Sequence, residues 1–281
     1  MAYKKVIINA DDFGLTESCT KAIADAYRKR LVSDMSMVAN GEAFELAVRL
    51  YKEDISSVGI HFNLTEGKPL TERMRRNKRF VNGGMFNGIF RQNQAYFMYI
   101  SDNDKKDIIA ELEAQIKRIY QSGVRISHAD SHQHIHYRFT LAPLILGVCK
   151  RYGIRKIRKM KNIGFSSKKH IKKFISSKYN SYLQGQGFIC TDYFQNIHNY
   201  SLIPDGCSEM MIHPDYDNAG RLIDKRFVRF LDAKSGKAKE RYRLLENYVY
   251  EKIGGEGGRM LITYEDLLNG KNDDEENCKN D

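Results

Sequence analysis

The stretch Val6-Ile7-Ile8-Asn9-Ala10-Asp11-Asp12-Phe13-Gly14 decides the fold of this 281-residue chain. Its first three residues form a continuous apolar run, which is typical of a parallel strand buried on both faces. Two adjacent carboxylates, Asp11 and Asp12, follow where this strand ends. The stretch therefore predicts a buried parallel strand with acidic groups at its carboxyl end.

Strand-like and helix-like patterns alternate along the rest of the chain. Apolar or alternating runs predict further strands at 35–39, 58–64, 124–129, 154–157, 188–191, 210–212 and 260–263. Apolar residues at helical spacing predict helices at 19–27, 43–50, 108–120 and 141–152. Strands that alternate with helices pair in parallel, so the fold class is α/β. Their number favours a regular or distorted, TIM-barrel-like (β/α) barrel, with a doubly wound open sheet as the alternative.

The pattern indicates one barrel domain over residues 1–270. Within it, residues 66–103 are rich in loop-forming residues, and we expect them to form a lid or an excursion that shapes the substrate site. Residues 271–281 are polar and acidic, which is typical of a disordered tail.

Composition is typical of a globular enzyme in a reducing compartment. Hydrophobic residues make up 42% of the chain and charged residues 29%. The five cysteines lie far apart and form no CxxC pair, which argues against a disulfide framework. No signal-peptide pattern precedes the first strand, and no apolar run approaches the roughly 18 residues that span a bilayer. We therefore expect a cytoplasmic protein that does not enter a membrane.

The formal net charge of +11 reflects basic residues that concentrate in the stretch 150–178. Such a stretch is compatible with a solvated surface or with a rim for a charged ligand. No zinc-finger or RNP-type motif accompanies it, which disfavours nucleic acid as a partner. A polyanion-binding protein remains an alternative from a different functional class.

The acidic pair at the end of the first strand has two interpretations. Adjacent carboxylates are costly unless something positive lies beside them. A metal ion can accept Asp12 or Asp11 while the other carboxylate stays free as a base. The alternative is a helix cap in a strand-to-helix loop.

Histidines cluster in the segment His128-Ala129-Asp130-Ser131-His132-Gln133-His134-Ile135-His136, which holds four of the eight in the chain. On an extended backbone His132, His134 and His136 would project to the same side. Imidazole is the commonest side-chain ligand of divalent transition metals. Some of these residues would be ligands and others would orient ligands or contact substrate. The alternative is a polar or pH-sensitive loop.

Two isolated histidines also lie on predicted strands. His61, within Gly59-Ile60-His61-Phe62-Asn63-Leu64, is by itself more typical of a packed histidine than of a ligand. His213 follows the apolar run 210–212 and precedes Pro214, so it is either a strand terminator or a general acid.

Together these residues are typical of metal-assisted hydrolysis. A carboxylate takes a proton from a metal-bound water, and a protonated histidine donates to the departing amine. The chain has no Gly-x-Ser-x-Gly elbow, P-loop or GxGxxG motif.

Three motifs resemble those of the YdjC-like carbohydrate deacetylases. They are Asn9-Ala10-Asp11-Asp12-Phe13-Gly14, Gly59-Ile60-His61-Phe62-Asn63-Leu64-Thr65 with Gly67-Lys68-Pro69-Leu70, and His128-x-Asp130-Ser131-His132-Gln133-His134-x-His136. The resemblance runs from about Lys4 to about Leu268. It implies a distorted (β/α) barrel related to the polysaccharide deacetylases, a divalent metal usually given as magnesium, and often a homodimer. The implied reaction removes the N-acetyl group from an N-acetylglucosamine-containing mono- or oligosaccharide.

The resemblance also implies a role for each matching residue. Asp12, His61 and His132 would be the metal ligands, Asp11 the general base and His213 the acid. His128, Asp130, His134 and His136 would bind substrate or orient the ligands. The family commonly has Gly after the His-Pro pair, whereas this chain has Asp215. Two imidazole ligands suit zinc or another transition metal better than magnesium. A metal-dependent hydrolase of another amide or ester remains the second hypothesis for the activity.

Overall fold

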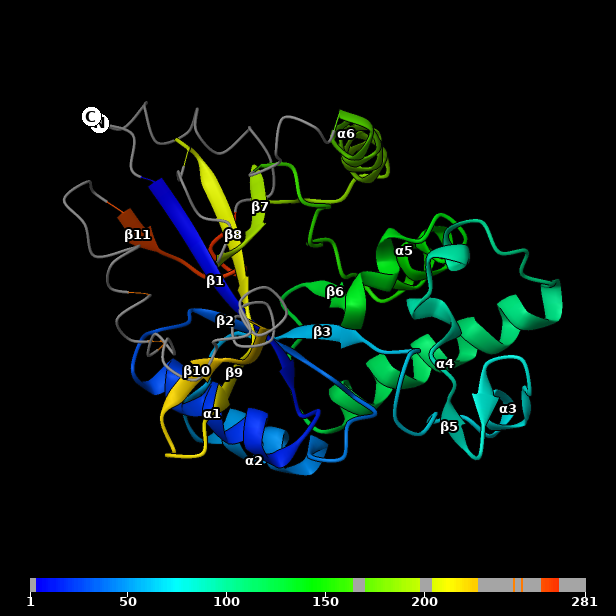
Figure 1. Ribbon diagram of the computed structural model, residues 1–281, viewed down its shortest axis with the longest axis horizontal. Helices are drawn as coiled ribbons and strands as arrows, with labels where there is room; N and C mark the ends of the chain where they lie inside the picture. The colour runs from blue at the N-terminus through cyan, green and yellow to red at the C-terminus, as the bar shows by residue number, and fades with distance from the viewer. Residues whose placement is uncertain are drawn as a thin grey trace, which may run out of the picture.

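A parallel sheet lies at the centre of the computed structural model, which describes residues 4–163, 170–197, 204–226, 245, 249 and 259–267 (Figure 1). Its strands are β1 (Lys4–Phe13), β2 (Asp34–Met37), β3 (Gly59–Phe62), β6 (Ala129–Ser131), β7 (Tyr193–Asn196), β8 (Cys207–Ile212) and β11 (Arg259–Leu261). The order is β6-β3-β2-β1-β8-β7. The long strand β1 pairs with β8 on one side, and with β11 and then β2 along the other.

Isolated parallel β-bridges connect β6, at one end of this strand order, with the segment that leads into β7 at the other end. Ala129 in β6 pairs with Ile157, and the adjacent Lys156 pairs with Ile189, which leads into β7. The sheet therefore curls into a distorted (β/α) barrel, as predicted, and the doubly wound open sheet is excluded. The carboxyl ends of its parallel strands meet at one edge.

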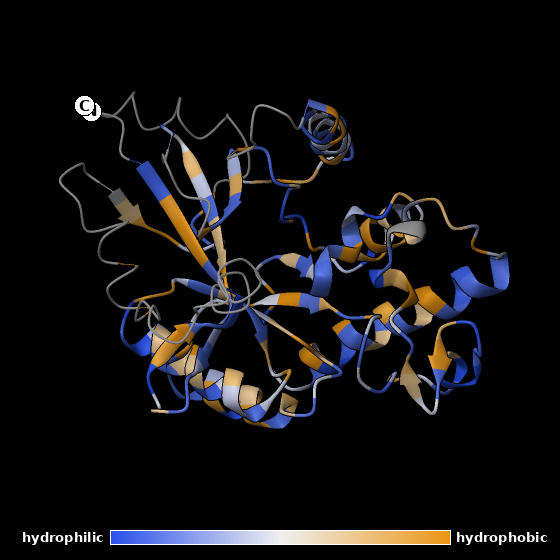
Figure 2. Cartoon of the chain, in the orientation of Figure 1, coloured by the Kyte–Doolittle hydropathy of each residue, from blue (hydrophilic) through white to orange (hydrophobic). Residues whose placement is uncertain are grey.

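Helices cover the outside of the barrel. They are α1 (Glu17–Arg28), α2 (Phe44–Asp54), α4 (Asp102–Gln121), α5 (Ala142–Arg151) and α6 (His170–Gly185). The Thr16 side chain caps α1 by accepting the Cys19 N–H, and Ser101 caps α4 in the same way. The apolar middle of β1 stands out in Figure 2 between polar ends. None of the described helices is long and apolar enough to cross a membrane.

Several elements differ from the predicted pattern. The strand predicted at 124–129 begins only at Ala129, and the one predicted at 188–191 is reduced to the bridge at Ile189. Helix α6 and the hairpin of β9 (Pro214–Tyr216) and β10 (Leu222–Asp224) were not predicted. The acidic tail 271–281 and part of the basic stretch, 164–169, lie outside the described residues.

Residues 66–103 form an excursion beside α4. It contains α3 (Glu72–Arg76), the hairpin of β4 (Val81–Asn82) and β5 (Met85–Phe86), and two 3-10 turns, η1 (Ile89–Arg91) and η2 (Asn93–Tyr96). Carboxylates along one side of α4 hold this excursion in place through hydrogen bonds. Asp107 accepts hydrogen bonds from Arg73 and Asn77, and Glu111 accepts the backbone N–H groups of Leu70 and Thr71.

Candidate metal centre and catalytic site

Asp12, His61 and His132 lie together at the carboxyl edge of the barrel. Their donor atoms lie within 4.8 Å of one another, a group that could hold a metal ion. The Asp12 Oδ1 atom is 2.6 Å from His132 Nδ1 and 3.2 Å from His61 Nε2. Asp12 has a φ of 76°, and the register of β1 against β2 shifts between Ala10 and Phe13. The left-handed conformation, which aspartate tolerates, thus interrupts the regular pairing of β1 one residue before the strand ends.

A second carboxylate lies on the far nitrogen of each histidine. His61 Nδ1 donates to Asp130 Oδ1 at 2.6 Å, and His132 Nε2 donates to Glu66 Oε1. Metal-binding histidines commonly donate their other N–H to a carboxylate in this way, which fixes the ring. The donor set and its supporting groups therefore fit a divalent cation.

Negative charge dominates this group. Burial lowers the pKa of His61, but the charges of Asp130 and Asp12 outweigh it and raise the pKa to about 10. Burial also lowers the pKa of His132, but Asp12 and Glu66 outweigh this effect and raise the pKa to about 9. The surroundings thus stabilise positive charge between these side chains.

A buried arginine organises the carboxylates beneath the site. Arg158 is inaccessible to solvent, and its Nη1 and Nη2 atoms each donate to Asp11 at 2.7 Å. It also pairs with Asp130 at 2.7 Å and with Glu209 at 2.6 Å. Burial opposes ionisation of Asp11, but Arg158 outweighs it and holds the pKa of that carboxyl well below its usual range. The sequence suggested that one carboxylate of the pair would stay free as a base. In the structure Asp11 is ionised, but the Arg158 guanidinium holds both of its oxygens.

His213 lies at the end of β8 beside Asp11, with its Nε2 atom 3.8 Å from Asp11 Oδ2. The β9–β10 hairpin returns the chain to this point, where the Lys225 N–H donates to the His213 carbonyl at 2.9 Å. Burial and the nearby Arg226 lower the pKa of His213 to about 4. The ring is thus neutral at neutral pH.

Asp215 takes the place of the glycine that the family resemblance would put after the His-Pro pair. Its carboxylate accepts a hydrogen bond from Ser18 of α1 at 2.5 Å and pairs with Lys225 at 2.9 Å. The aspartate fastens the β9–β10 hairpin to α1 and so steadies the backbone beside His213.

The remaining histidines of the cluster pack below or beside the site. His128 is buried and stacks on Tyr264 with ring centroids 3.8 Å apart. The expectation that His132, His134 and His136 share one side is wrong, because 132–137 forms a 3-10 turn in which Gln133 and His134 are left-handed. His134 instead stacks on Tyr137, and His136 hydrogen-bonds Ser131.

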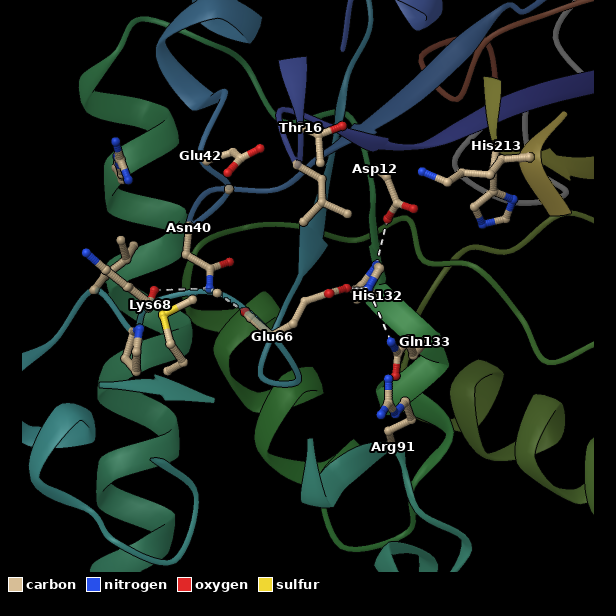
Figure 3. A pocket seen from close by; sticks show the side chains of 18 of the residues that line it. Asp12, Thr16, Asn40, Glu42, Glu66, Lys68, Arg91, His132, Gln133 and His213 are labelled. Carbon is tan, nitrogen blue, oxygen red and sulfur yellow. Dashed lines mark hydrogen bonds and ion pairs between the residues drawn. The ribbon is translucent and has the colours of Figure 1, made fainter. Parts of the chain in front are cut away.

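A pocket of about 940 Å³ opens above the metal-site residues (Figure 3). Asp12, His132 and His213 line it next to the metal-site residues, and the start of the excursion, from Glu66 to Leu70, lines one wall. Basic residues outnumber acidic ones around it; they are Lys68, Arg75, Arg91, Arg118, Lys225 and Arg226. The pocket is large enough for a molecule the size of a sugar.

Sequence reasoning missed three charged residues of the site: Glu66, Arg158 and Glu209. Glu66 stands at the first position of the predicted excursion, in a loop with no periodic signal. Arg158 was counted in the basic stretch, where its position just after the predicted strand 154–157 was the available signal. Glu209 lies within β8, where its charge in a buried strand pointed to a partner.

Comparison with known proteins identifies the family of this chain. A carbohydrate deacetylase of Brevibacillus brevis is 28% identical, over 94% of this chain and 99% of its own length. A carbohydrate deacetylase of Halalkalibacterium halodurans is 31% identical, over 75% of this chain and 85% of its own length. The crystal structure of an Enterococcus faecalis protein, described as a cellobiose-phosphate cleavage protein, shares the fold with a TM-score of 0.66 and 23% identity, covering 95% of this chain and all of that one. The model of the YdjC-like protein family matches residues 5–248, and this chain belongs to that family.

Proposed function

We propose that this protein is a metal-dependent carbohydrate deacetylase that hydrolyses the N-acetyl group of an N-acetylglucosamine-containing mono- or oligosaccharide. The observation that carries the proposal is the convergence of Asp12, His61 and His132, with Asp11 and His213 close by, next to a pocket that Asp12, His132 and His213 line. The names of the relatives support the deacetylase activity and the carbohydrate class of substrate.

Asp12, His61 and His132 would hold the metal. When bound there, a divalent cation polarises a carbonyl oxygen and lowers the pKa of a water molecule. Magnesium is the ion that the family resemblance implies, whereas the two imidazole nitrogens favour zinc or another transition metal. Asp130 and Glu66 keep the two rings oriented by accepting their far N–H groups.

Asp11 would act as the base. Arg158 holds both of its oxygens, so the carboxylate cannot rotate away from the site. Because its pKa is held far below neutrality, Asp11 is ionised at any ordinary pH, which is the state that a base requires.

His213 would be the acid, and its neutral state implies that it gains its proton during the reaction. Its Nε2 atom lies 3.8 Å from Asp11 Oδ2, close enough for a proton to pass between them after a small movement. His213 then donates from Nε2 to the departing amine.

Acetate release from N-acetylglucosamine oligomers tests this function. We expect chelators to abolish it, and Asp11→Asn to lower the rate about 10²–10⁴-fold while metal binding persists. Lys52→Gln, on the outer surface of α2, serves as the control and should retain full activity. Full activity of Asp11→Asn would show that the base is wrongly assigned.

A panel of other amides and esters distinguishes this proposal from the second hypothesis, in which the same site hydrolyses a different substrate. For the polyanion-binding alternative, Arg158 and Lys159 of the basic stretch are buried and so not available to a ligand. Salt-dependent binding that survives mutation of His132 would favour that alternative. The proposal also includes the cytoplasmic location, the single domain and the homodimer that we expected above; sedimentation equilibrium tests the dimer.

A further inference from the structure

We propose that Glu66 is a positioning residue of the metal centre, through which the wall of the substrate pocket holds the ligand His132. The inference rests on the proposed function only in that Asp12, His61 and His132 must hold a cation. It is carried by the contacts of Glu66, which link the pocket wall to the site.

The Glu66 carboxylate contacts His132 on the side away from Asp12. Its Oε1 atom accepts the Nε2–H, while His132 Nδ1 faces Asp12 Oδ1 at 2.6 Å (Figure 3). An imidazole whose Nε2–H is held by an acceptor exposes its lone pair at Nδ1. Glu66 therefore keeps Nε2 directed at the pocket wall and Nδ1 directed at Asp12 and His61, where Nδ1 can bind a cation once it has lost its proton.

The pair Glu66–His132 matches the pair Asp130–His61. In each, a carboxylate accepts the N–H that points away from the cluster of donor atoms. Glu66 itself is not one of those grouped donors, which are Asp12, His61 and His132. Its geometry is that of a residue acting through a ligand, since it contacts the nitrogen opposite to the site.

A rigid set of hydrogen bonds holds the Glu66 backbone. The Asn63 side chain accepts the Glu66 N–H at 3.3 Å and donates to its carbonyl at 2.9 Å. Gln115 of α4 in turn hydrogen-bonds both the N–H and the carbonyl of Asn63, at 3.0 and 2.8 Å. All these groups of Asn63 and Gln115 are buried. Glu66 is thus fixed to α4 although its own side chain is 48% exposed to the pocket.

The experiment measures the affinity of the purified full-length protein for Mn²⁺ and Zn²⁺ by calorimetry without substrate. We expect Glu66→Ala to weaken binding about 10–100-fold, the usual effect of removing a carboxylate that orients a metal-binding histidine. Glu66→Gln should bind more tightly than Glu66→Ala, because its amide oxygen still accepts the Nε2–H. Glu42→Gln is the matched control: it removes another carboxylate of the same pocket and should leave the metal affinity unchanged.

Nitrogen NMR of the Zn²⁺-loaded protein provides a readout that loss of charge alone would not move. We expect His132 of the wild type to show one state, with Zn²⁺ on Nδ1 and a slowly exchanging Nε2–H, and Glu66→Ala to show a broadened signal and a faster-exchanging Nε2–H. Unchanged metal affinity in Glu66→Ala, with only KM raised, would overturn the inference and make Glu66 a substrate contact. A wild type that binds metal but releases no acetate would contradict the proposed function alone. A wild type that binds no metal would overturn both.

Discussion

The two histidines at the site are held from two different regions. Asp130, on β6, belongs to a buried floor that Arg158 ties together inside the barrel. Glu66 belongs to a partly exposed wall that α4 ties down from outside. The floor thus depends on buried charges that are costly to separate, whereas the wall depends on local hydrogen bonds. Changes in the floor should lower the stability of the whole fold, and changes in the wall should act mainly on the site and the excursion.

The largest effect is expected from Arg158→Met. The substitution leaves Asp11, Asp130 and Glu209 buried without their shared cation, which should destabilise the fold by about 3–5 kcal/mol. Urea unfolding followed by circular dichroism measures the loss. A loss below about 1 kcal/mol would mean that water or rearrangement replaces the arginine, and the contrast between floor and wall would fail.

Gly59→Ala tests the packing of the floor without changing a charge. A Cβ atom on Gly59 would lie 2.4 Å from the ring of His128, so we expect a destabilisation of about 1–3 kcal/mol in thermal unfolding. Gly147→Ala in α5 is the matched control, because its Cβ meets nothing closer than 3.9 Å. It should stabilise the helix by about 0.5–1 kcal/mol. Equal effects of the two substitutions would contradict tight packing around His128.

The titration of Glu209 should make the stability of the floor depend on pH. Burial raises the pKa of this carboxyl from 4.5 to about 7, although Arg158 opposes the rise. The folded state thus binds this proton more tightly than the unfolded state does. The group's stabilising contribution is complete below the unfolded pKa and is lost as the pH rises through about 7. Unfolding measured across that window should show a steeper fall in the wild type than in Glu209→Gln; parallel curves would contradict the assignment.

The smallest effect is expected from Glu111→Gln on α4. Glu111 accepts the N–H groups of Leu70 and Thr71 at 2.8 Å each, and the amide can replace only one of these acceptors. We expect a loss of about 1 kcal/mol and faster hydrogen exchange confined to the excursion. Faster exchange throughout the barrel would show that the wall and the floor are one cooperative unit.

Much of the site followed from the sequence because parallel strands bring their carboxyl ends to one edge. Asp11, Asp12, His61 and His213 each stand at or near the end of a strand whose apolar run was recognisable. Their proximity needed only the alternation of strands and helices. The distorted barrel was predictable for the same reason.

The supporting residues could not be predicted in this way. Arg158 belongs to a basic stretch typical of solvated surface, and only the meeting of three carboxylates from separate strands makes its burial stable. Glu66 lies in a loop whose backbone is fixed by Asn63, not by periodic burial. The predicted direction of the His134 side chain was wrong because a left-handed backbone at Gln133 and His134 breaks the alternation of an extended chain.

In crystals grown with Mn²⁺, the anomalous difference map should show one strong peak per chain, bonded to Asp12, His61 and His132, with Asp11 beside it but still paired to Arg158. A peak elsewhere, or no peak at a saturating concentration, would show that these three side chains do not share one ion.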